Sequence, residues 1–506
     1  MQILGTSLAV PNWLLYSALA AAAAYAYGAW PYRYWKRRGI RGPLMLPYLE
    51  GTLELAKMKD FRDMMMTELR RYGRVYGTYF MRQPVLVVAD PEMVKQICVK
   101  RAENFIDRST FGMDFSPLNK GVLMLKGQEW KRVRSLLSPT FSSGKIKAMY
   151  PLIEQCSNQL CASLLKAPEE TVDIKKYLMN FTMDAVACTM FGLQVNAQED
   201  ENSEFKKHTN EVFNMSMRSW KFWALILFPR ITKPLFCRFR ISLFKMETLD
   251  FFQTVISQAL REREASENAD KYSDFLASMV EARREAESQG LKGLTEEEVM
   301  AQSLTFFLGG LETTATALQY LAYFLAFNKQ CQERAYLEVI EARDKHGGTL
   351  SYECVQGLKY LGHCIDESMR MCPPVMMSDR ICTETTVVNG YEIEKDVLAR
   401  IPIYTLAHDP ELWDDPETFN PDRFDEANSA ERDAARLIPF GLGPRGCIAM
   451  RLAQVEIRKA MAEMLLRLEF SPADCTEPFE RLQFKLAPVL TTKEPIRLRV
   501  RQRGEL

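Results

Sequence analysis

Cys447 is the residue of this sequence whose setting best suits metal chemistry. It ends the run FGLGPRGC, residues 440–447, and a glycine-rich turn allows backbone N–H groups to approach a cysteine sulfur closely. A helix predicted to begin near Cys447 also points its positive end at the sulfur, which favours the thiolate. Arg445 carries a guanidinium that suits a cofactor carboxylate. These features predict that Cys447 is a thiolate ligand of a metal-containing cofactor.

The same run has a second interpretation as a dinucleotide-binding loop. Gly441, Gly443 and Gly446 spell G-x-G-x-x-G before a predicted helix, a fingerprint that is weak when it stands alone. Only about 60 residues follow it, fewer than several βαβ units need. Pro444 and Cys447 also have no role in that interpretation, so we favour the thiolate ligand.

A long helix is predicted to position a second set of groups. Thr295 and Glu298 form a capping-box pattern, and the apolar periodicity continues to about Phe327. At 1.5 Å per residue this helix is roughly 48 Å long. Gly309 and Gly310 interrupt it at a cost of roughly 1 kcal/mol each relative to alanine, so a local need for a thin backbone is indicated.

The remaining pattern predicts a mainly α-helical fold with smaller β-sheets (α+β). Short strands are expected at 75–80 and 85–88, and a hairpin with an Asn-Gly turn at 385–393. Helical patterning dominates from about 90 to 345, and a last helix carries a charged stripe at Glu456, Lys459, Glu463 and Arg467. No internal repeat or Ser/Gly-rich break divides the chain, so one large domain is predicted.

Composition excludes several classes of function. The 65 Lys and Arg residues balance the 65 Asp and Glu residues, so no overall field indicates nucleic acid as a partner. Twelve cysteines contain no C-x-x-C pair and the four histidines lie far apart. A zinc site, a covalent haem attachment and a disulfide scaffold are therefore not predicted.

The N-terminal segment predicts a membrane anchor. Residues 13–30 are almost wholly apolar, and together with Leu8–Val10 they approach the roughly 20 residues that span a bilayer core. A basic cluster follows at Arg33, Lys36–Arg38 and Arg41, which places the rest of the chain in the cytosol by the positive-inside rule. A cleaved signal peptide is the alternative, but its leading segment would lack Lys and Arg.

Five motifs in one order make the sequence resemble the cytochrome P-450 superfamily. Residues 440–447 resemble its cysteine-loop signature, F-x-x-G-x-R-x-C-x-G. The other four are WxxxR at 130–134, the long-helix signature at 309–314, ExxR at 367–370 and PxRF at 421–424. Residues 130–149 and 306–318 are most similar to the animal microsomal family-3 clan, a group that includes thromboxane synthase.

The resemblance implies a membrane-bound monooxygenase of the endoplasmic reticulum, with its catalytic domain facing the cytosol. The cofactor would be haem b, and NADPH-derived electrons would arrive through NADPH–cytochrome reductase, with cytochrome b5 as a further partner. Substrates would be lipophilic: xenobiotics, steroids or fatty acids. The expected organisation is an anchor at 1–32, a basic, proline-containing linker at 33–51 and a haem-binding catalytic domain at 52–506.

The resemblance also assigns roles to individual residues. Cys447 would ligate the iron, and Glu312 and Thr313 would relay protons on the oxygen side. The alternative for Thr313 is a hydroxyl that bonds back to its own helix. Glu367, Arg370 and Arg423 would be structural. Cofactor binding is expected from Arg445, Trp130, Arg134, Arg380, Arg108 and Phe440, and substrate contact from Thr305, Leu308, Val375, Met376 and Ser378. Lys131, Arg132 and Arg458 would supply positive charge for the reductase.

Three positions depart from the family pattern. Ala449 stands where glycine is usual, Gly309 where alanine is commoner, and Arg41 where a proline is usual; none removes a chemical group. Two rival functions also use a bound haem. An isomerase of the thromboxane synthase type needs no proton relay, and the pair Glu312-Thr313 argues against it. A non-enzymatic haem binder would not consume NADPH with substrate, so we favour the monooxygenase.

Overall fold

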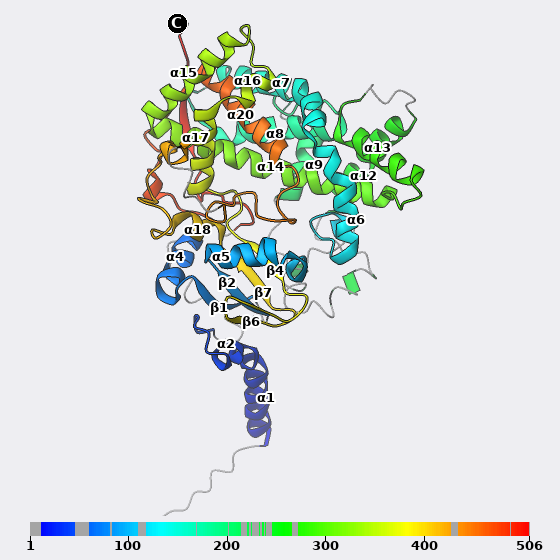
Figure 1. Ribbon diagram of the computed structural model, residues 1–506, viewed down its shortest axis with the longest axis vertical. Coiled ribbons are helices and arrows are strands. Elements are labelled where there is room, and N and C mark those ends of the chain that lie inside the picture. Colours follow the sequence, from blue (N-terminus) through cyan, green and yellow to red (C-terminus); the bar gives the residue numbers. More distant parts are fainter. Residues whose placement is uncertain are drawn as a thin grey trace, which may run out of the picture.

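The computed structural model describes most of the chain. The described ranges are 12–45, 60–80, 83–109, 118–167, 169–200, 202–213, 245–265, 272–426, 434–485 and 487–504, with isolated positions between 220 and 238. A large helical part and a smaller part that contains the main sheet lie next to each other, and helix α1 projects away beyond the sheet (Figure 1). The predicted mainly α fold with small sheets is confirmed.

The long helix α14, Glu296–Phe327, runs through the helical part. Its N-terminus is the predicted capping box: Glu298 N donates to Thr295 Oγ1 at 3.2 Å, and Thr295 N donates to Glu298 Oε2 at 2.9 Å. Three glutamates in the first turn favour the positive end of the helix. Its C-terminal half is buried on nearly every side, as is typical of a core helix.

Other helices surround α14 and carry most of the remaining chain (Figure 1). The nearest are α8 (Ile174–Phe191), α17 (Lys359–Met371) and α20 (Met450–Arg467), and α7 (Ser143–Leu165) packs on α8 and α20. The others are α2 (Tyr34–Arg37), α4 (Phe61–Tyr72), α5 (Pro91–Lys95), α6 (Gly127–Leu137), α9 (Glu204–Phe213), α12 (Met246–Glu264), α13 (Phe275–Ser288), α15 (Lys329–Lys345), α16 (Tyr352–Gln356) and α18 (Ile403–His408).

Three of the four charged residues in the stripe of α20 lie inside the protein, and Arg467 at its end is exposed. Glu456, Lys459 and Glu463 are all buried. Lys459 is tolerated there because its ammonium contacts Glu463 and Glu154, each at 2.7 Å. Glu456 has no such partner, since its Oε1 is buried without a hydrogen bond.

The main sheet has the order β1-β2-β7-β4. Strands β1 (Val75–Phe80) and β2 (Gln83–Val88) form an antiparallel pair, as predicted, β2 pairs in parallel with β7 (Leu398–Ile401), and β7 pairs antiparallel with β4 (Ser378–Ile381). The predicted hairpin is also present as β5 (Thr386–Val388) and β6 (Tyr391–Ile393). A third sheet joins β3 (Thr171–Asp173), β9 (Arg497–Gln502) and β8 (Leu468–Pro472).

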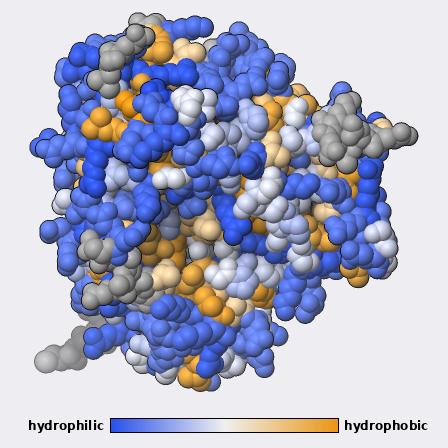
Figure 2. Space-filling view, turned by 45° about the horizontal axis from the view of Figure 1, so that its top comes forward, coloured by the Kyte–Doolittle hydropathy of each residue, from blue (hydrophilic) through white to orange (hydrophobic). Residues whose placement is uncertain are grey.

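The N-terminal segment contains helix α1, Asn12–Ala29, whose large apolar side chains are exposed. Leu8–Val10, which the anchor prediction included, lie outside the described residues. Within the described ranges no helix combines the length and the apolar character needed to cross a bilayer. Most of the surface of the body is hydrophilic, with apolar side chains gathered in a hollow of one face (Figure 2).

Candidate active site

The loop that precedes Cys447 is held by its own backbone. Cys447 N donates to Phe440 O, Gly446 N to Gly443 O and Gly441 N to Ile438 O, each at 2.8 Å. Gly443 has a φ of +74°, and a β-carbon there would lie 1.8 Å from the carbonyl oxygen of Cys98. Glycine is therefore required at this position both by backbone conformation and by space.

Cys447 is accessible, unlike most of the cysteines. Among those that the structure describes, only Cys447 and Cys475 are exposed. Protein atoms still surround the sulfur closely, so burial raises the pKa of the Cys447 thiol, while the Ala449 N–H, Arg134 and Arg108 lower it. Helix α20 begins at Met450 rather than at Cys447 itself, and the sulfur lies just before its positive end.

Three arginines from separate elements donate to the cysteine loop, and a fourth, Arg445, belongs to the loop itself. Arg108 Nη2 donates to Arg445 O at 2.5 Å, Arg134 Nη2 to Gly446 O at 3.1 Å, and Arg380 Nη2 to Leu442 O at 3.5 Å. Burial, with the neighbouring cations, lowers the pKa of Arg108 to about 9 and that of Arg445 to about 9. Such a cluster of like charges is stabilised by anions.

These arginines fit the carboxylates of a haem. Arg108 Nε is buried without a hydrogen-bond partner, and Asp107 gives Arg445 only a 3.7 Å ion pair. Two carboxylates placed among these guanidiniums would offset the repulsion and satisfy the unpaired donor. An accessible thiol that lies beside the same guanidiniums completes a donor set suited to a haem-thiolate site.

Arg445 is more strongly engaged with the protein than a free cofactor clamp would be. Its guanidinium donates to the carbonyls of Ile106 at 2.6 Å, Leu125 at 2.6 Å and Val122 at 3.2 Å. Its charge also lies over the ring of Trp130, 4.1 Å from the ring centre. Arg445 therefore links the backbone at Ile106 and at Val122–Leu125 to the cysteine loop, in addition to any role toward a cofactor.

The two glycines of α14 differ in the space that surrounds them. A β-carbon at Gly309 would meet no atom within 4 Å, although its neighbours Phe307 and Leu311 are fully buried. A β-carbon at Gly310 would instead lie 3.1 Å from the side chain of Val186. Only Gly309 thus leaves open room beside the helix.

Glu312 and Thr313 follow the pair and make separate contacts. Thr313 Oγ1 donates to Gly309 O at 2.6 Å, which is the local bond expected of a helical threonine. Glu312 Oε1 forms an ion pair with Lys175 Nζ at 3.5 Å. Burial lowers the pKa of Lys175, and Glu312 raises it. No motif or periodicity singled out Lys175, which lies on α8.

The residues predicted to contact substrate occupy two elements. Thr305 and Leu308 lie on α14 and are partly buried, and the Thr305 hydroxyl donates to Ala301 O at 2.7 Å. Val375 and Met376 precede β4, and Met376 is buried. Ser378 begins β4 and accepts a hydrogen bond from Arg380 Nη1 at 2.8 Å. Ser378 is thus linked directly to one of the four arginines.

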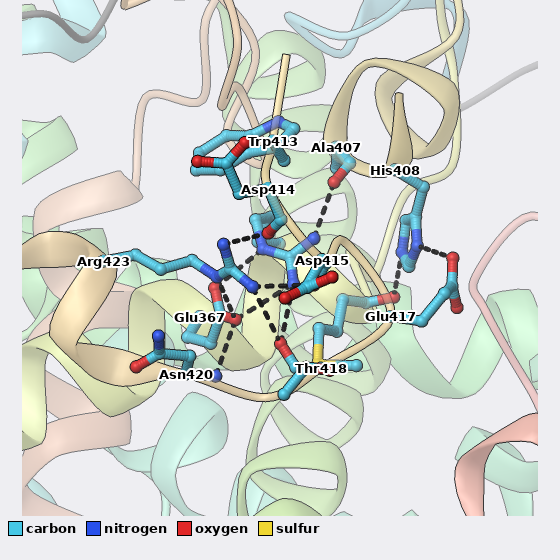
Figure 3. A network of polar contacts seen from close by, with 12 residues as sticks. Glu367, Ala407, His408, Trp413, Asp414, Asp415, Glu417, Thr418, Asn420 and Arg423 are labelled. Carbon is cyan, nitrogen blue, oxygen red and sulfur yellow. Dashed lines mark hydrogen bonds and ion pairs between the residues drawn. The ribbon is translucent and has the colours of Figure 1, made fainter. Parts of the chain in front are cut away.

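Glu367, Arg370 and Arg423 form a buried ion network (Figure 3). Arg370 Nε lies 2.7 Å from Glu367 Oε2, and Arg423 Nε lies 3.2 Å from Glu367 Oε1. The side chains of Glu367 and Arg370 are fully buried. Arg370 Nη1 also donates to Ala407 O at 2.7 Å, so the network ties α17 to α18 and to the loop around Arg423.

His408 belongs to the same region and was not predicted. Its Nδ1 lies 2.9 Å from Glu417 Oε1 and its Nε2 2.9 Å from Met371 O (Figure 3). Burial lowers the pKa of this fully buried histidine, and Glu417 opposes that change. Nothing in the sequence separates His408 from the other three histidines, because its partners come from distant segments.

Comparisons with known proteins agree with this geometry. Residues 40–500 match the family model described as Cytochrome P450. The chain is 34% identical to cytochrome P450 3A30 of Fundulus heteroclitus over 97% of its length and 98% of that protein's. It is 32% identical to cytochrome P450 3A9 of Rattus norvegicus and to cytochrome P450 3A7 of Homo sapiens, in each case over 99% of this chain and 98% of the relative.

Proposed function

The chain belongs to the cytochrome P450 family of haem-thiolate monooxygenases, and from this premise we propose that it hydroxylates lipophilic molecules at a haem held by Cys447. The observation that carries the proposal is the convergence of Arg108, Arg134 and Arg380 on the loop of the accessible Cys447. These residues come from separate elements, and an anionic cofactor at this place would offset the repulsion between their charges and satisfy the unpaired Arg108 Nε.

The residues of this chain would hold the haem on two sides. Cys447 would bind the iron, and Arg108, Arg134, Arg380 and Arg445 would pair with the carboxylates, alongside Trp130 and Phe440. When bound, the haem supplies the iron at which dioxygen is activated. Ala449, next to the ligand, contributes its N–H to the sulfur, and a backbone donor of this kind is retained whichever side chain stands there.

Thr313 and Glu312 would deliver protons to the oxygen side. The Thr313 hydroxyl donates its own proton to Gly309 O, so its oxygen keeps lone pairs that accept a hydrogen bond. Glu312 is held by Lys175 rather than by Thr313. A proton would therefore pass from the Lys175–Glu312 pair toward Thr313 through solvent in the space beside Gly309.

The substrate would be a xenobiotic or a steroid, or another molecule of similar apolarity. Leu308, Val375 and Met376 offer apolar contacts. Two hydroxyls add polar groups: Thr305 donates its proton to Ala301 O, and Ser378 Oγ accepts from Arg380. A pocket with this lining favours molecules that bury apolar surface in it, and its few polar groups fix the orientation of the bound molecule. The open side of Gly309 would leave room for a bulky substrate close to the haem.

The electron donor would be NADPH–cytochrome reductase, with cytochrome b5 as a second partner. Of the three cations expected at the docking face, Arg132 already pairs with Glu129 and Glu298, and burial lowers the pKa of Arg458. Lys131 is exposed. Lys131 would therefore contribute more to an encounter with an acidic partner than the other two.

The protein would reside in the endoplasmic reticulum membrane, with the domain after residue 52 facing the cytosol. The support is the apolar, exposed surface of α1 followed by the basic cluster at Arg33–Arg41. A linker at 33–51 would join this anchor to the catalytic domain.

Replacement of Cys447 tests the proposed function directly. With reductase and NADPH, the native chain should convert members of a panel of steroids, fatty acids and drugs to hydroxylated products. Cys447→Ser should lose both product formation and the thiolate-type spectrum of the reduced carbon monoxide complex, because serine offers no thiolate. Cys475→Ser is the matched control, since Cys475 is also exposed. Persistence of the thiolate spectrum in Cys447→Ser would refute the ligand assignment.

A further inference from the structure

Gln302 of α14 holds the backbone of the loop at residues 120–125. Its side chain is fully buried. Gln302 Oε1 accepts a hydrogen bond from Val122 N at 2.7 Å, and Gln302 Nε2 donates to Lys120 O at 2.7 Å. One planar amide thus binds two backbone groups of the same loop, 180 residues away along the chain at Val122.

The same loop is also bound by the cysteine loop. Val122 O accepts from Arg445 Nη1 at 3.2 Å, and Leu125 O accepts from Arg445 Nη2 at 2.6 Å. Val122 therefore links the two elements. Its N–H is bound by Gln302 of α14, and its carbonyl is bound by Arg445 of the cysteine loop. Gln302 and Arg445 thus both hold the 120–125 backbone.

The loop has little freedom between these two attachments. A β-carbon at Gly121 would lie 2.1 Å from Thr305 Oγ1, so the loop backbone lies directly on α14. Lys120 also forms an ion pair with Glu297 in the first turn of that helix. Because both ends of the contact are hydrogen-bonded and the space is filled, a shift of α14 has to move the loop backbone as well.

A simpler role for Gln302 is to satisfy two buried backbone groups, as buried amides commonly do. That role explains the bonds to Lys120 and Val122 but gives no effect beyond the loop. The second set of bonds, from Arg445 to Val122 and Leu125, extends the contact to the residues around Cys447. The two roles therefore differ in what happens to the cysteine loop when Gln302 is replaced.

We propose that Gln302 is a positioning residue that couples α14 to the cysteine loop through the backbone of residues 120–125. By this connection, changes on the substrate side of α14 reach the Arg445 guanidinium beside the cofactor carboxylates. The role of Arg445 toward a haem rests on the proposed function; the hydrogen-bonded connection does not.

Gln302→Met in the haem-loaded full-length chain tests this coupling. Methionine keeps the volume of glutamine but neither accepts from Val122 N nor donates to Lys120 O. Gln319→Met is the matched control, because Gln319 is a buried glutamine of the same helix whose Oε1 has no hydrogen-bond partner. Amide hydrogen exchange of the segments 118–126 and 441–449 and the midpoint potential of the haem are measured for both variants.

In Gln302→Met we expect amide exchange at 118–126 to become at least tenfold faster. Exchange at 441–449 should rise severalfold and the haem potential should shift, whereas Gln319→Met should leave all three unchanged. If amide exchange became faster at 118–126 while exchange at 441–449 and the haem potential stayed unchanged, Gln302 would be only a local anchor. That result would overturn the proposal. Equal effects in both variants would also overturn it. A native chain without the thiolate-type carbon monoxide spectrum would instead refute the proposed function, and the exchange data would still decide the coupling.

Discussion

At the scale of single residues, the proposed oxygen side of the site depends on three neighbouring residues of α14. Thr313 bonds back to Gly309 O, Glu312 pairs with Lys175, and Gly309 leaves open space between the helix and its surroundings. The local bond of Thr313 and a relay role are compatible, because a hydroxyl donates one hydrogen bond and accepts others.

Thr313→Ala should separate electron use from product formation. The variant should keep its haem and its thiolate spectrum, while product per NADPH consumed falls by about tenfold or more, because the hydroxyl that passes protons is missing. The measurement is the ratio of product to NADPH oxidised. Thr313→Ser keeps the hydroxyl and should retain most of the coupling. Unchanged coupling in Thr313→Ala would place the relay at another residue.

Glu456 should make stability fall as the pH rises. Burial raises the pKa of this unpartnered carboxyl to about 8, from an ordinary value of 4.5. Between these values the folded chain keeps a proton that the unfolded chain has lost, so stability decreases by about 1.4 kcal/mol per pH unit. Glu456→Gln should remove this contribution, because an amide does not titrate.

The comparison is thermal unfolding of both chains between pH 5.5 and 7.5. The variant should gain stability relative to the native chain across this interval, and Glu285→Gln, at an exposed carboxylate, should change little. A constant difference between the native chain and Glu456→Gln at all pH values would show that Glu456 is not protonated in the fold.

At the scale of elements, the buried ions join α17 to the segment that precedes the cysteine loop. Glu367 accepts from Arg370 and Arg423 and also from Asn420 N at 2.9 Å. Two neighbouring hydrogen bonds also link α17 to α18. One runs from Arg370 to Ala407 O, and the other joins His408 and Met371 O. The two helices therefore keep a fixed relation under the site.

Arg370→Met should destabilise the chain more than Arg423→Met. Removal of Arg370 leaves Glu367 without its fully buried partner, which should lower the free energy of unfolding by about 3–5 kcal/mol. Removal of Arg423, which is partly exposed, leaves that partner in place and should cost about 1–2 kcal/mol. Denaturant unfolding followed by circular dichroism and by haem absorbance gives both values. Equal losses would indicate that the two arginines share the charge of Glu367 evenly.

At the scale of the whole molecule, the segment after α1 is docked on the outer edge of the main sheet. Trp35 is buried, and its Nε1 donates to Thr78 O at 2.7 Å. Gly77 N donates to Arg41 O at 2.8 Å, and a β-carbon at Gly77 would lie 2.3 Å from Trp35 Cγ. These contacts with β1 thus determine the place on the main sheet from which the chain continues to α1.

Gly77→Ala should release this segment without disturbing the haem site. The added methyl displaces the Trp35 ring, so trypsin should cut between Arg33 and Arg41 severalfold faster, as followed by mass spectrometry of the fragments. The carbon monoxide spectrum should not change, because the contact between Gly77 and Trp35 lies on β1, away from Cys447. Gly144→Ala, where a β-carbon meets no atom within 4 Å, is the control. Unchanged cleavage would mean that the segment is held by other contacts.

The sequence by itself determined the features that depend on local chemistry. The capping box placed the start of α14, since both of its hydrogen bonds join residues three apart. Gly443 and the Asn-Gly turn between β5 and β6 both have a left-handed backbone conformation, which explains why glycine stands in both places. The cysteine loop and the family were recognisable because their residues are contiguous or keep a set order.

Only the tertiary structure decided which distant groups meet. Lys175 was found as the partner of Glu312, Val122 as the partner of Gln302, and Met371 and Glu417 as the partners of His408. It also placed most of the charged stripe of α20 inside the protein, where Lys459 is paired and Glu456 is not. Such contacts leave no periodic or short-range pattern, because the free energy that holds each pair depends on the packing of separate elements around it. Cys447 and the arginines could thus be predicted from the sequence, but the contacts of those arginines with the loop, the Lys175 partner of Glu312 and the connection to α14 required the fold.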